Sequence, residues 1–238
     1  MCEQFVACSD RPFRLDELWP FTERLERFGI AGFGWGAAWW CGDGALQSYR
    51  DLRAFRDDPG REAVGRTEAR AALVHLRRPS KLSTMTPADT QPFHDPHGRF
   101  AFSHNGDFRR HRGSRDGYRA AGRIQGRADS EVGQRWLEDH WAPAPTAAPG
   151  EANAGLLERL HEAFGGQANL ATIAADGSVR HYAGNTENPV FTFRLGEIQL
   201  ASTAIYSIDR SLFRFVAPDA RSRGVIAQGA SFTAFGRV

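Results

Sequence analysis

The chain has 238 residues, a length that suits one large domain or two small ones. Its formal net charge of +2 argues against a dedicated binder of nucleic acid or of anionic membranes, and we expect neither kind of partner. The three cysteines, Cys2, Cys8 and Cys41, form no CxxC pair and no disulfide framework of the secreted kind. Because no signal peptide and no membrane-spanning stretch is recognisable, we expect a protein of the reducing cytoplasm.

Apolar residues make up 41% of the chain and aromatic residues 11%, which is enough for a sizeable core. The expected strands cover residues 4–8, 32–40, 45–49, 71–77, 100–104, 169–174, 179–183, 190–195, 198–202 and 225–235. The expected helices cover residues 15–28, a segment that begins near residue 129, and residues 156–164. Strands at both ends with helices between them favour an α+β fold with antiparallel sheets over repeated βαβ units.

Turn residues mark the connections between these elements. Ser9-Asp10-Arg11-Pro12 is predicted to end the first strand, and Asp176-Gly177 predicts a hairpin turn. Residues 109–127 are expected to form a basic, glycine-containing loop. Residues 142–150 are expected to form a surface connection rather than a domain boundary, so we expect one domain over residues 1–238.

One predicted strand, residues 32–40, has one face lined by glycine and alanine. Gly34 and Gly36 lie on this face together with Ala38, and Trp35 lies on the opposite face. A glycine-lined face lets another backbone or a ligand approach closely. Trp35 is a candidate pocket wall, although a core position is the simpler interpretation.

A cysteine directly follows the initiator methionine. The small side chain of Cys2 should permit removal of Met1, which would leave a thiol and a free α-amine on one residue. An α-amine with a pKa of roughly 7.7–8.0 is partly unprotonated near neutral pH and can accept the proton of the thiol. Taken alone, however, Cys2 is better explained as a small residue at the start of a buried strand.

Three further motifs follow in the chain: His75-Leu76-Arg77, His104-Asn105-Gly106 and Asp129-Ser130-Glu131. Singly, each has an ordinary explanation: a surface arginine after a strand, a type I′ hairpin turn and a helix N-cap. Together with Cys2, in this order and spacing, they resemble the class II glutamine amidotransferases, a family of N-terminal-nucleophile hydrolases with an N-terminal cysteine. The resemblance covers most of the chain and is closest to the short, stand-alone members.

The resemblance implies a four-layer αββα sandwich of two antiparallel sheets and a reaction that needs no metal or organic cofactor. It implies that Cys2 attacks the side-chain amide of glutamine, and that water then releases glutamate from a γ-glutamyl thioester. Asn105 and the backbone N–H of Gly106 would stabilise the oxyanion. Arg77 would bind the α-carboxylate of the substrate, and Asp129 its α-ammonium group.

The chain departs from the family pattern in two loops. Arg77 is followed by Arg78-Pro79-Ser80, and we expect Ser80 to occupy the hydroxyl position that the family places in the substrate site. Gln91-Pro92-Phe93 stands where the short members commonly have His-Pro-Phe. We also place His104 among the substrate-binding residues.

Two other site readings are weaker. His94-Asp95-Pro96-His97 could suggest a metal site, but no third protein ligand is identifiable, and we expect no metal. The arginines of residues 109–127 lack the interleaved aromatic residues of an RNA-binding platform, which favours a solvated loop.

Several functions are compatible with the resemblance. The protein could hydrolyse free glutamine and supply ammonia to a separate synthase. It could instead hydrolyse a γ-glutamyl amide, as some short members do in ergothioneine synthesis. A catalytically silent binding or regulatory subunit would retain Met1, whereas an acylase of the penicillin or bile-salt amidase type would share only the N-terminal cysteine. In each enzymatic case the substrate is a small molecule.

Overall fold

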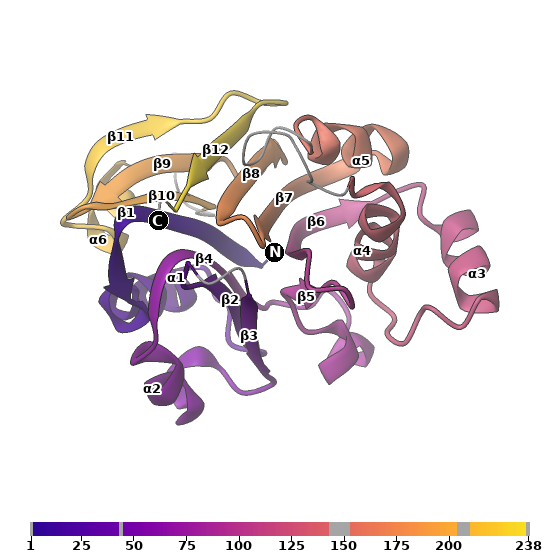
Figure 1. Cartoon of the computed structure of the whole chain (residues 1–238), viewed down its shortest axis with the longest axis horizontal. Coiled ribbons are helices and arrows are strands. Elements are labelled where there is room, and N and C mark those ends of the chain that lie inside the picture. The colour runs from indigo at the N-terminus through magenta and orange to yellow at the C-terminus, as the bar shows by residue number, and fades with distance from the viewer. Residues whose placement is uncertain (1, 43–44, 143–152, 204–209, 237–238) are drawn as a thin grey trace.

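The computed structural model describes residues 2–42, 45–142, 153–203 and 210–236. Two antiparallel sheets pack face to face, and helices lie on their outer sides (Figure 1). The strands of the larger sheet are β1 (Glu3–Arg14), β2 (Trp35–Trp40), β3 (Leu46–Asp51), β4 (Glu68–Leu76), β9 (Val190–Leu195), β10 (Ile198–Thr203) and β11 (Arg221–Val225). Those of the smaller sheet are β5 (Phe93–His94), β6 (Phe100–Phe108), β7 (Gly166–Ala174), β8 (Ser178–Gly184) and β12 (Ser231–Phe235).

The α-helices are α1 (Trp19–Phe28), α2 (Gly60–Gly65), α3 (Arg112–Ala120), α4 (Asp129–His140), α5 (Leu156–Phe164) and α6 (Arg210–Val216). Short 3₁₀ helices are η1 (Leu15–Leu18), η2 (Phe55–Asp57), η3 (Leu82–Thr84) and η4 (Pro87–Asp89). The strand order is β11-β9-β10-β1-β4-β2-β3 in the larger sheet and β12-β8-β7-β6-β5 in the smaller one. This arrangement confirms the expected α+β class and the four-layer αββα sandwich; the single-domain expectation stays a prediction.

Three apolar cores separate the four layers. The middle core lies between the sheets and contains Val6 and Leu73 from the larger sheet and Ile173 from the smaller. One outer core joins the larger sheet to α1 and α6, with Phe21 and Phe213 both packed against Phe193.

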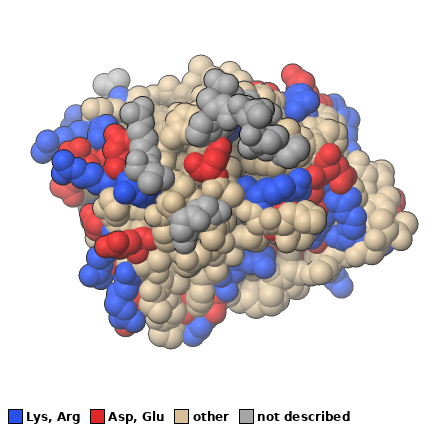
Figure 2. Space-filling model, viewed as in Figure 1, with Lys and Arg blue, Asp and Glu red and all other residues tan. Residues whose placement is uncertain are grey.

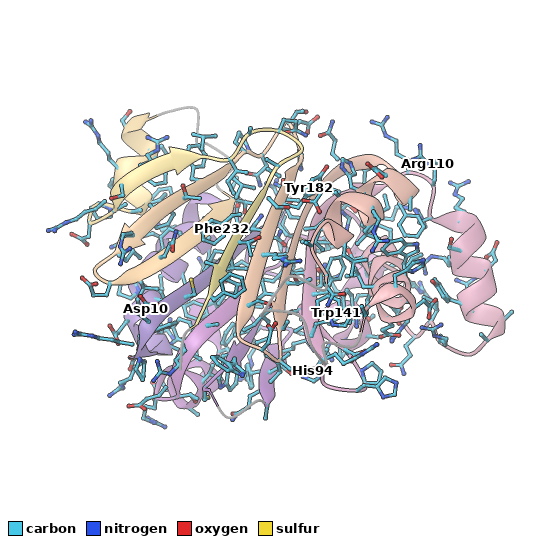
Figure 3. The ribbon with its side chains drawn as sticks, turned by 45° about the horizontal axis from the view of Figure 1, so that its top comes forward. Asp10, His94, Arg110, Trp141, Tyr182 and Phe232 are labelled. Atoms are coloured by element: carbon cyan, nitrogen blue, oxygen red, sulfur yellow. The ribbon has the colours of Figure 1, made fainter. Side chains whose placement is uncertain are left out.

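The other outer core joins the smaller sheet to α4 and α5. Val132 of α4 and Leu160 of α5 pack there with Leu170 of β7. Tyr182 on β8 belongs to this core, and Trp141 packs against it from the residue after α4 (Figure 3). Figure 2 shows Lys and Arg side chains interspersed with Asp and Glu on the viewed face.

The alternation of side chains along β1 and β4 decides what faces the space between the sheets. Val6 on β1 and Leu73 on β4 belong to the middle core, so residues two and four positions away point the same way. Cys2 is therefore on the inner side with Val6, and Arg77 is on the inner side with Leu73. The pairing of Glu3 with Leu76 puts Cys2 and Arg77 at the same end of the sheet.

The glycine-lined face of β2 meets another backbone, as its sequence predicts. A Cβ added to Gly36 would lie 2.4 Å from the carbonyl oxygen of Gln91 and 2.9 Å from Cδ of Pro92. Trp35 is fully buried on the opposite face, where its indole N–H donates to Asp58 Oδ2 at 2.9 Å. Trp35 is thus a core residue.

Three expectations about the elements need correction. Strand β1 continues through Ser9-Asp10-Arg11-Pro12 to Arg14, with only a shift in its pairing to β4 between Cys8 and Phe13. Residues 225–235 form the end of β11 and the whole of β12, which belong to different sheets. The predicted loop at residues 109–127 contains helix α3.

The ordinary explanation of Asn105-Gly106, a hairpin turn, does not apply. Both residues lie within β6 and pair with Asn169 and Ala168 of β7. The turn predicted at Asp176-Gly177 is confirmed: Gly177, with φ of 78°, lies between β7 and β8. Most of the expected connection at residues 142–150 lies outside the described residues.

We expect Gly36→Ala to lower the free energy of unfolding by about 1–3 kcal/mol, because the added methyl group would overlap the backbone of Gln91. Denaturant unfolding monitored by tryptophan fluorescence measures this effect. Gly113→Ala on α3 is the control, since an added Cβ there meets nothing within 4 Å and stability should change little. Equal midpoints for the two variants would contradict the close approach.

Candidate active site

Cys2 lies at the start of β1, beside the end of β4. Its Sγ accepts a hydrogen bond from the backbone N–H of Arg78 at 3.2 Å and lies 3.5 Å from the carbonyl oxygen of the same residue. Burial raises the pKa of the Cys2 thiol, while the Arg78 N–H and the nearby guanidinium of Arg77 act in the opposite direction. A thiol in this position needs a base before it can react as a thiolate.

Arg77 is 3% exposed and lies on the same inner face as Cys2. Its Nη1 donates to the backbone oxygen of Asp89 and its Nη2 to that of Thr84, whereas Nε has no partner among the described residues. In the described part of the chain the guanidinium forms no ion pair with a carboxylate. Burial lowers the pKa of Arg77, and the charges of Cys2 and Asp89 oppose this. A buried guanidinium bonded only to carbonyl groups favours the binding of an anion.

Asn105 comes to Cys2 from the other sheet. It is fully buried on β6, and its side-chain Nδ2 donates to the backbone oxygen of Cys2 at 2.5 Å. Its Oδ1 has no partner in the described part of the structure. The structure therefore brings Cys2, Arg77 and Asn105 together.

Gly106 has a backbone conformation that excludes other residues. Its φ is +145°, and an added Cβ would lie 1.6 Å from the carbonyl oxygen of Gln167 on β7. Glycine is required here by the close approach of two strands. That requirement is independent of any contact between Gly106 and a substrate.

Asp129 is the first residue of α4. Its Oδ2 accepts the backbone N–H of Phe108 at 2.6 Å, and its Oδ1 accepts that of Ser130 at 3.0 Å. Among the described residues its carboxylate forms no ion pair with Arg, Lys or His. The carboxylate thus joins the start of the helix to the end of β6.

His104 and Ser80 are not brought to Cys2 in the same way. The His104 ring lies on the opposite face of β6 from Asn105; it stacks on Phe108 at 4.1 Å, and its Nδ1 lies 3.0 Å from Ser130 Oγ. Ser80 is exposed on the loop after β4. The arrangement suits His104 to hold β6 against α4 rather than to contact a ligand at Cys2.

Sequence reasoning missed two residues that support the site. Gln91 accepts the backbone N–H of His104 at 2.6 Å through Oε1, and its Nε2 donates to the His104 oxygen at 3.3 Å. Gln91 thereby braces the strand that carries Asn105. Asp89 is fully buried, and its backbone oxygen accepts a hydrogen bond from Arg77. The sequence drew attention to Gln91 only as a departure from the His-Pro-Phe of the short members, without a role, and the only signal for Asp89 is its place in a Pro-containing loop.

The His94-Asp95-Pro96-His97 segment has a structural explanation. The Asp95 carboxylate is fully buried and binds Arg99 through both its backbone N–H and its guanidinium. Among the described residues no group of three or more His, Cys, Asp or Glu side chains is arranged to hold a metal ion.

A family model for class II glutamine amidotransferases matches residues 1–194. The chain belongs to this family. Membership supports a glutamine amidohydrolase-type function for the protein. No curated protein sequence matches the chain.

Three solved structures share the N-terminal-nucleophile hydrolase fold with this chain. Glutamine phosphoribosylpyrophosphate amidotransferase from B. subtilis has a TM-score of 0.67 and 12% identity, over 98% of this chain and 49% of that one. An allosteric regulatory enzyme of purine biosynthesis has a TM-score of 0.70 and 12% identity, over 98% of this chain and 47% of that one. A class II glutamine aminotransferase domain protein from Silicibacter pomeroyi has a TM-score of 0.59 and 18% identity, over 98% of this chain and 95% of that one.

The chain spans about half the length of the first two structures. In the described ranges, none of its helices is long and apolar enough to cross a bilayer.

A cluster of buried polar side chains lies between the sheets behind Cys2. Ser103 Oγ donates to Gln4 Oε1 at 2.8 Å, and Gln4 Nε2 lies 3.4 Å from His181 Nε2. His75 is fully buried, and neither of its ring nitrogens has a partner in the described structure. Burial lowers the pKa of both His75 and His181 to about 3, so both rings are neutral near pH 7.

These neutral histidines predict a loss of stability in acid. Because their folded-state pKa lies below the value of about 6.5 in the unfolded chain, the unfolded state binds more protons between about pH 3 and 6.5. Their stabilising contribution is therefore fully present above pH 6.5 and falls as the pH drops toward 3. The change is at most about 1.4 kcal/mol per pH unit for each ring.

Denaturant unfolding of the wild type and of His75→Gln between pH 5 and 7 measures this contribution. The variant should lose less stability on acidification than the wild type does. Parallel pH profiles for the two proteins would show that His75 is not held neutral.

Proposed function

We propose that the protein hydrolyses the side-chain amide of glutamine or of a related γ-glutamyl amide, with Cys2 as an N-terminal nucleophile. The observation that carries this proposal is the buried guanidinium of Arg77 next to the Cys2 thiol, which forms no ion pair with any described carboxylate. The Asp129 carboxylate is the proposed partner of the ammonium group, and its hydrogen bonds within the described residues come from backbone N–H groups. A free α-amino acid head group carries the complementary pair of charges.

The proposed reaction begins after removal of Met1. The α-amine of Cys2 takes the thiol proton, and the sulfur attacks the amide carbon to give a tetrahedral oxyanion. The side-chain amide of Asn105 and the backbone of Gly106 are the proposed donors to that oxyanion, each typically worth about 10²–10³ in rate. The α-ammonium protonates the departing nitrogen, which leaves as ammonia or an amine. Water then attacks the thioester, and glutamate is released.

The buried thiol of Cys2 requires such a built-in base. Burial raises its pKa, so a thiolate forms only when the proton has an acceptor close by. The three free cysteines, Cys2, Cys8 and Cys41, are compatible with a reducing compartment, and we propose the cytoplasm as the setting.

The primary test uses 6-diazo-5-oxo-norleucine, a glutamine analogue with an electrophilic side chain. Intact-mass spectrometry of the wild type should show loss of Met1 and one adduct, which peptide mapping should place on Cys2. Cys2→Ala should take up no adduct and should not hydrolyse glutamine, because the nucleophile is gone. Its circular dichroism spectrum should match that of the wild type.

Cys41, which is half-buried, is the internal control for non-specific alkylation and should remain unmodified. A retained Met1 without an adduct would contradict the proposal and favour a silent binding subunit. A processed N-terminus without an adduct would indicate a different amide, as an acylase would use.

Arg77→Ala should raise KM for glutamine roughly 10- to 100-fold, because it removes the charged partner of the substrate carboxylate. The variant should lower kcat much less, since Cys2 and Asn105 remain in place. Lys81→Ala removes a positive charge from the exposed part of the same loop and should leave KM unchanged. Steady-state assays of ammonia release separate the two parameters. An Arg77→Ala variant with the wild-type KM would exclude this role for Arg77.

The identity of the amide and the fate of its nitrogen define the two versions of the proposal. Hydrolysis of free glutamine would call for a separate synthase partner that accepts ammonia, whereas hydrolysis of a γ-glutamyl conjugate would need none. Assays with glutamine and γ-glutamyl conjugates in parallel decide between them. A large kcat/KM preference for a conjugate would favour the ergothioneine type of reaction.

A further inference from the structure

Asp89 lies between the two residues that are proposed to bind the substrate head group. It is the last residue of η4, in the loop after β4, and its side chain is fully buried. Its backbone oxygen accepts a hydrogen bond from the guanidinium of Arg77. Its carboxylate points the other way, toward the segment that leads into α4.

The carboxylate of Asp89 holds the two residues before Asp129. Its Oδ1 accepts the backbone N–H of Arg127 at 2.7 Å and that of Ala128 at 2.6 Å, and its Oδ2 accepts the hydroxyl of Thr86 at 2.9 Å. Two charge-assisted hydrogen bonds to adjacent peptide groups fix both the position and the direction of the backbone. Asp129 follows immediately.

Glycine at position 126 allows this approach. A Cβ on Gly126 would lie only 2.2 Å from Asp89 Oδ1, so any larger residue would push the carboxylate away. Glu131 holds the preceding part of the same segment: its carboxylate accepts the N–H groups of Gln125 at 2.9 Å and Gly126 at 2.7 Å. Four successive N–H groups are thus held by two buried carboxylates.

The roles of the two carboxylates differ. Glu131 belongs to α4 itself, and it also pairs with Arg135 of the same helix at 3.3 Å. Asp89 comes from a different part of the chain, 39 residues before Ala128. Only Asp89 links the loop that contacts Arg77 to the start of the helix that carries Asp129.

We propose that Asp89 is a positioning residue that sets the separation between the Arg77 guanidinium and the Asp129 carboxylate. This inference rests on the proposed function, in which those two groups bind the α-carboxylate and the α-ammonium group. Asp89 thereby determines how selectively the site takes a free α-amino acid. It acts through Arg77 and Asp129 and does not touch the substrate.

The test compares Asp89→Ala and Asp89→Asn with the wild type. Asparagine keeps an acceptor for the N–H groups of Arg127 and Ala128 but removes the charge, whereas alanine removes the link. We expect KM for glutamine to rise about tenfold or more in Asp89→Ala and less in Asp89→Asn, with kcat changed far less.

A pair of thiol reagents separates head-group recognition from the reactivity of Cys2. Iodoacetamide carries neither a carboxylate nor an ammonium group, whereas 6-diazo-5-oxo-norleucine carries both. The rate of Cys2 alkylation by 6-diazo-5-oxo-norleucine should fall in parallel with the rise in KM. The rate with iodoacetamide should stay within about twofold of the wild type, because the thiol and its partners are unchanged.

Asp95→Asn is the matched control for loss of a buried carboxylate. Asp95 is also fully buried and also binds backbone N–H and guanidinium groups, but its side-chain bonds go to Arg99 in its own hairpin. This variant should be destabilised and yet keep the wild-type KM and the wild-type preference between the two reagents.

The outcomes are distinct. If Asp89→Ala folds and has the wild-type KM, the inference is wrong. If Asp89→Ala does not fold, Asp89→Asn decides in its place, and a wild-type KM in that variant would overturn the inference. An equal rise of KM in Asp95→Asn, or an equal loss of reactivity toward both reagents, would overturn it as well. If the wild type neither hydrolyses glutamine nor reacts with 6-diazo-5-oxo-norleucine, the proposed function fails, and the role of Asp89 fails with it.

Discussion

The antiparallel pairing of β1 with β4 is the constraint on which the site depends. Its register aligns Glu3 with Leu76 and so sets the Cys2 thiol against the backbone of Arg78. The same alternation turns the Arg77 side chain to the inner face, where it is buried and forms no ion pair with a described carboxylate. A shift of either strand by one residue would turn the side chain that it carries, Cys2 or Arg77, to the outer helical layer.

The rest of the site consists of contacts that carry distant segments to this sheet end. Asn105 of the smaller sheet donates a hydrogen bond to the carbonyl of Cys2, and Gln91 forms two hydrogen bonds with the backbone of His104. Asp89 and Asp129 then tie two loops and the start of α4 to the same region. Each of these bonds joins segments that are distant in the chain, so the site is a property of the assembled sandwich and not of any one segment.

The sequence predicted those site residues whose type and neighbouring residues form a recognisable motif. Cys2, Arg77 and Asn105 each belong to a short motif beside a predicted strand, and the structure brings the three together. Asp89 and Gln91 could not be found in this way, because their partners lie 39 and 13 residues away in the chain.

Among the elements, α3 was missed because its segment is basic and glycine-containing. Tertiary contacts hold it, including bonds from Arg115 to the carbonyl groups of Gly126 and Ala128.

Residues 225–235 are divided between the two sheets, and the pattern of apolar residues in this segment does not indicate that division. The short link between β11 and β12 is hydrogen-bonded to both sheets, through Ile226 N–H to the Val190 oxygen and through Gly229 N–H to the Ala183 oxygen. The register places Val190 and Ala183 at the same strand ends as Cys2 and Asn105, so this link ties the two sheets together at the end of the sandwich that carries the site. The sheets cannot part at that end unless the bonds of the link break, and the link therefore helps to keep Cys2 on one sheet opposite Asn105 on the other.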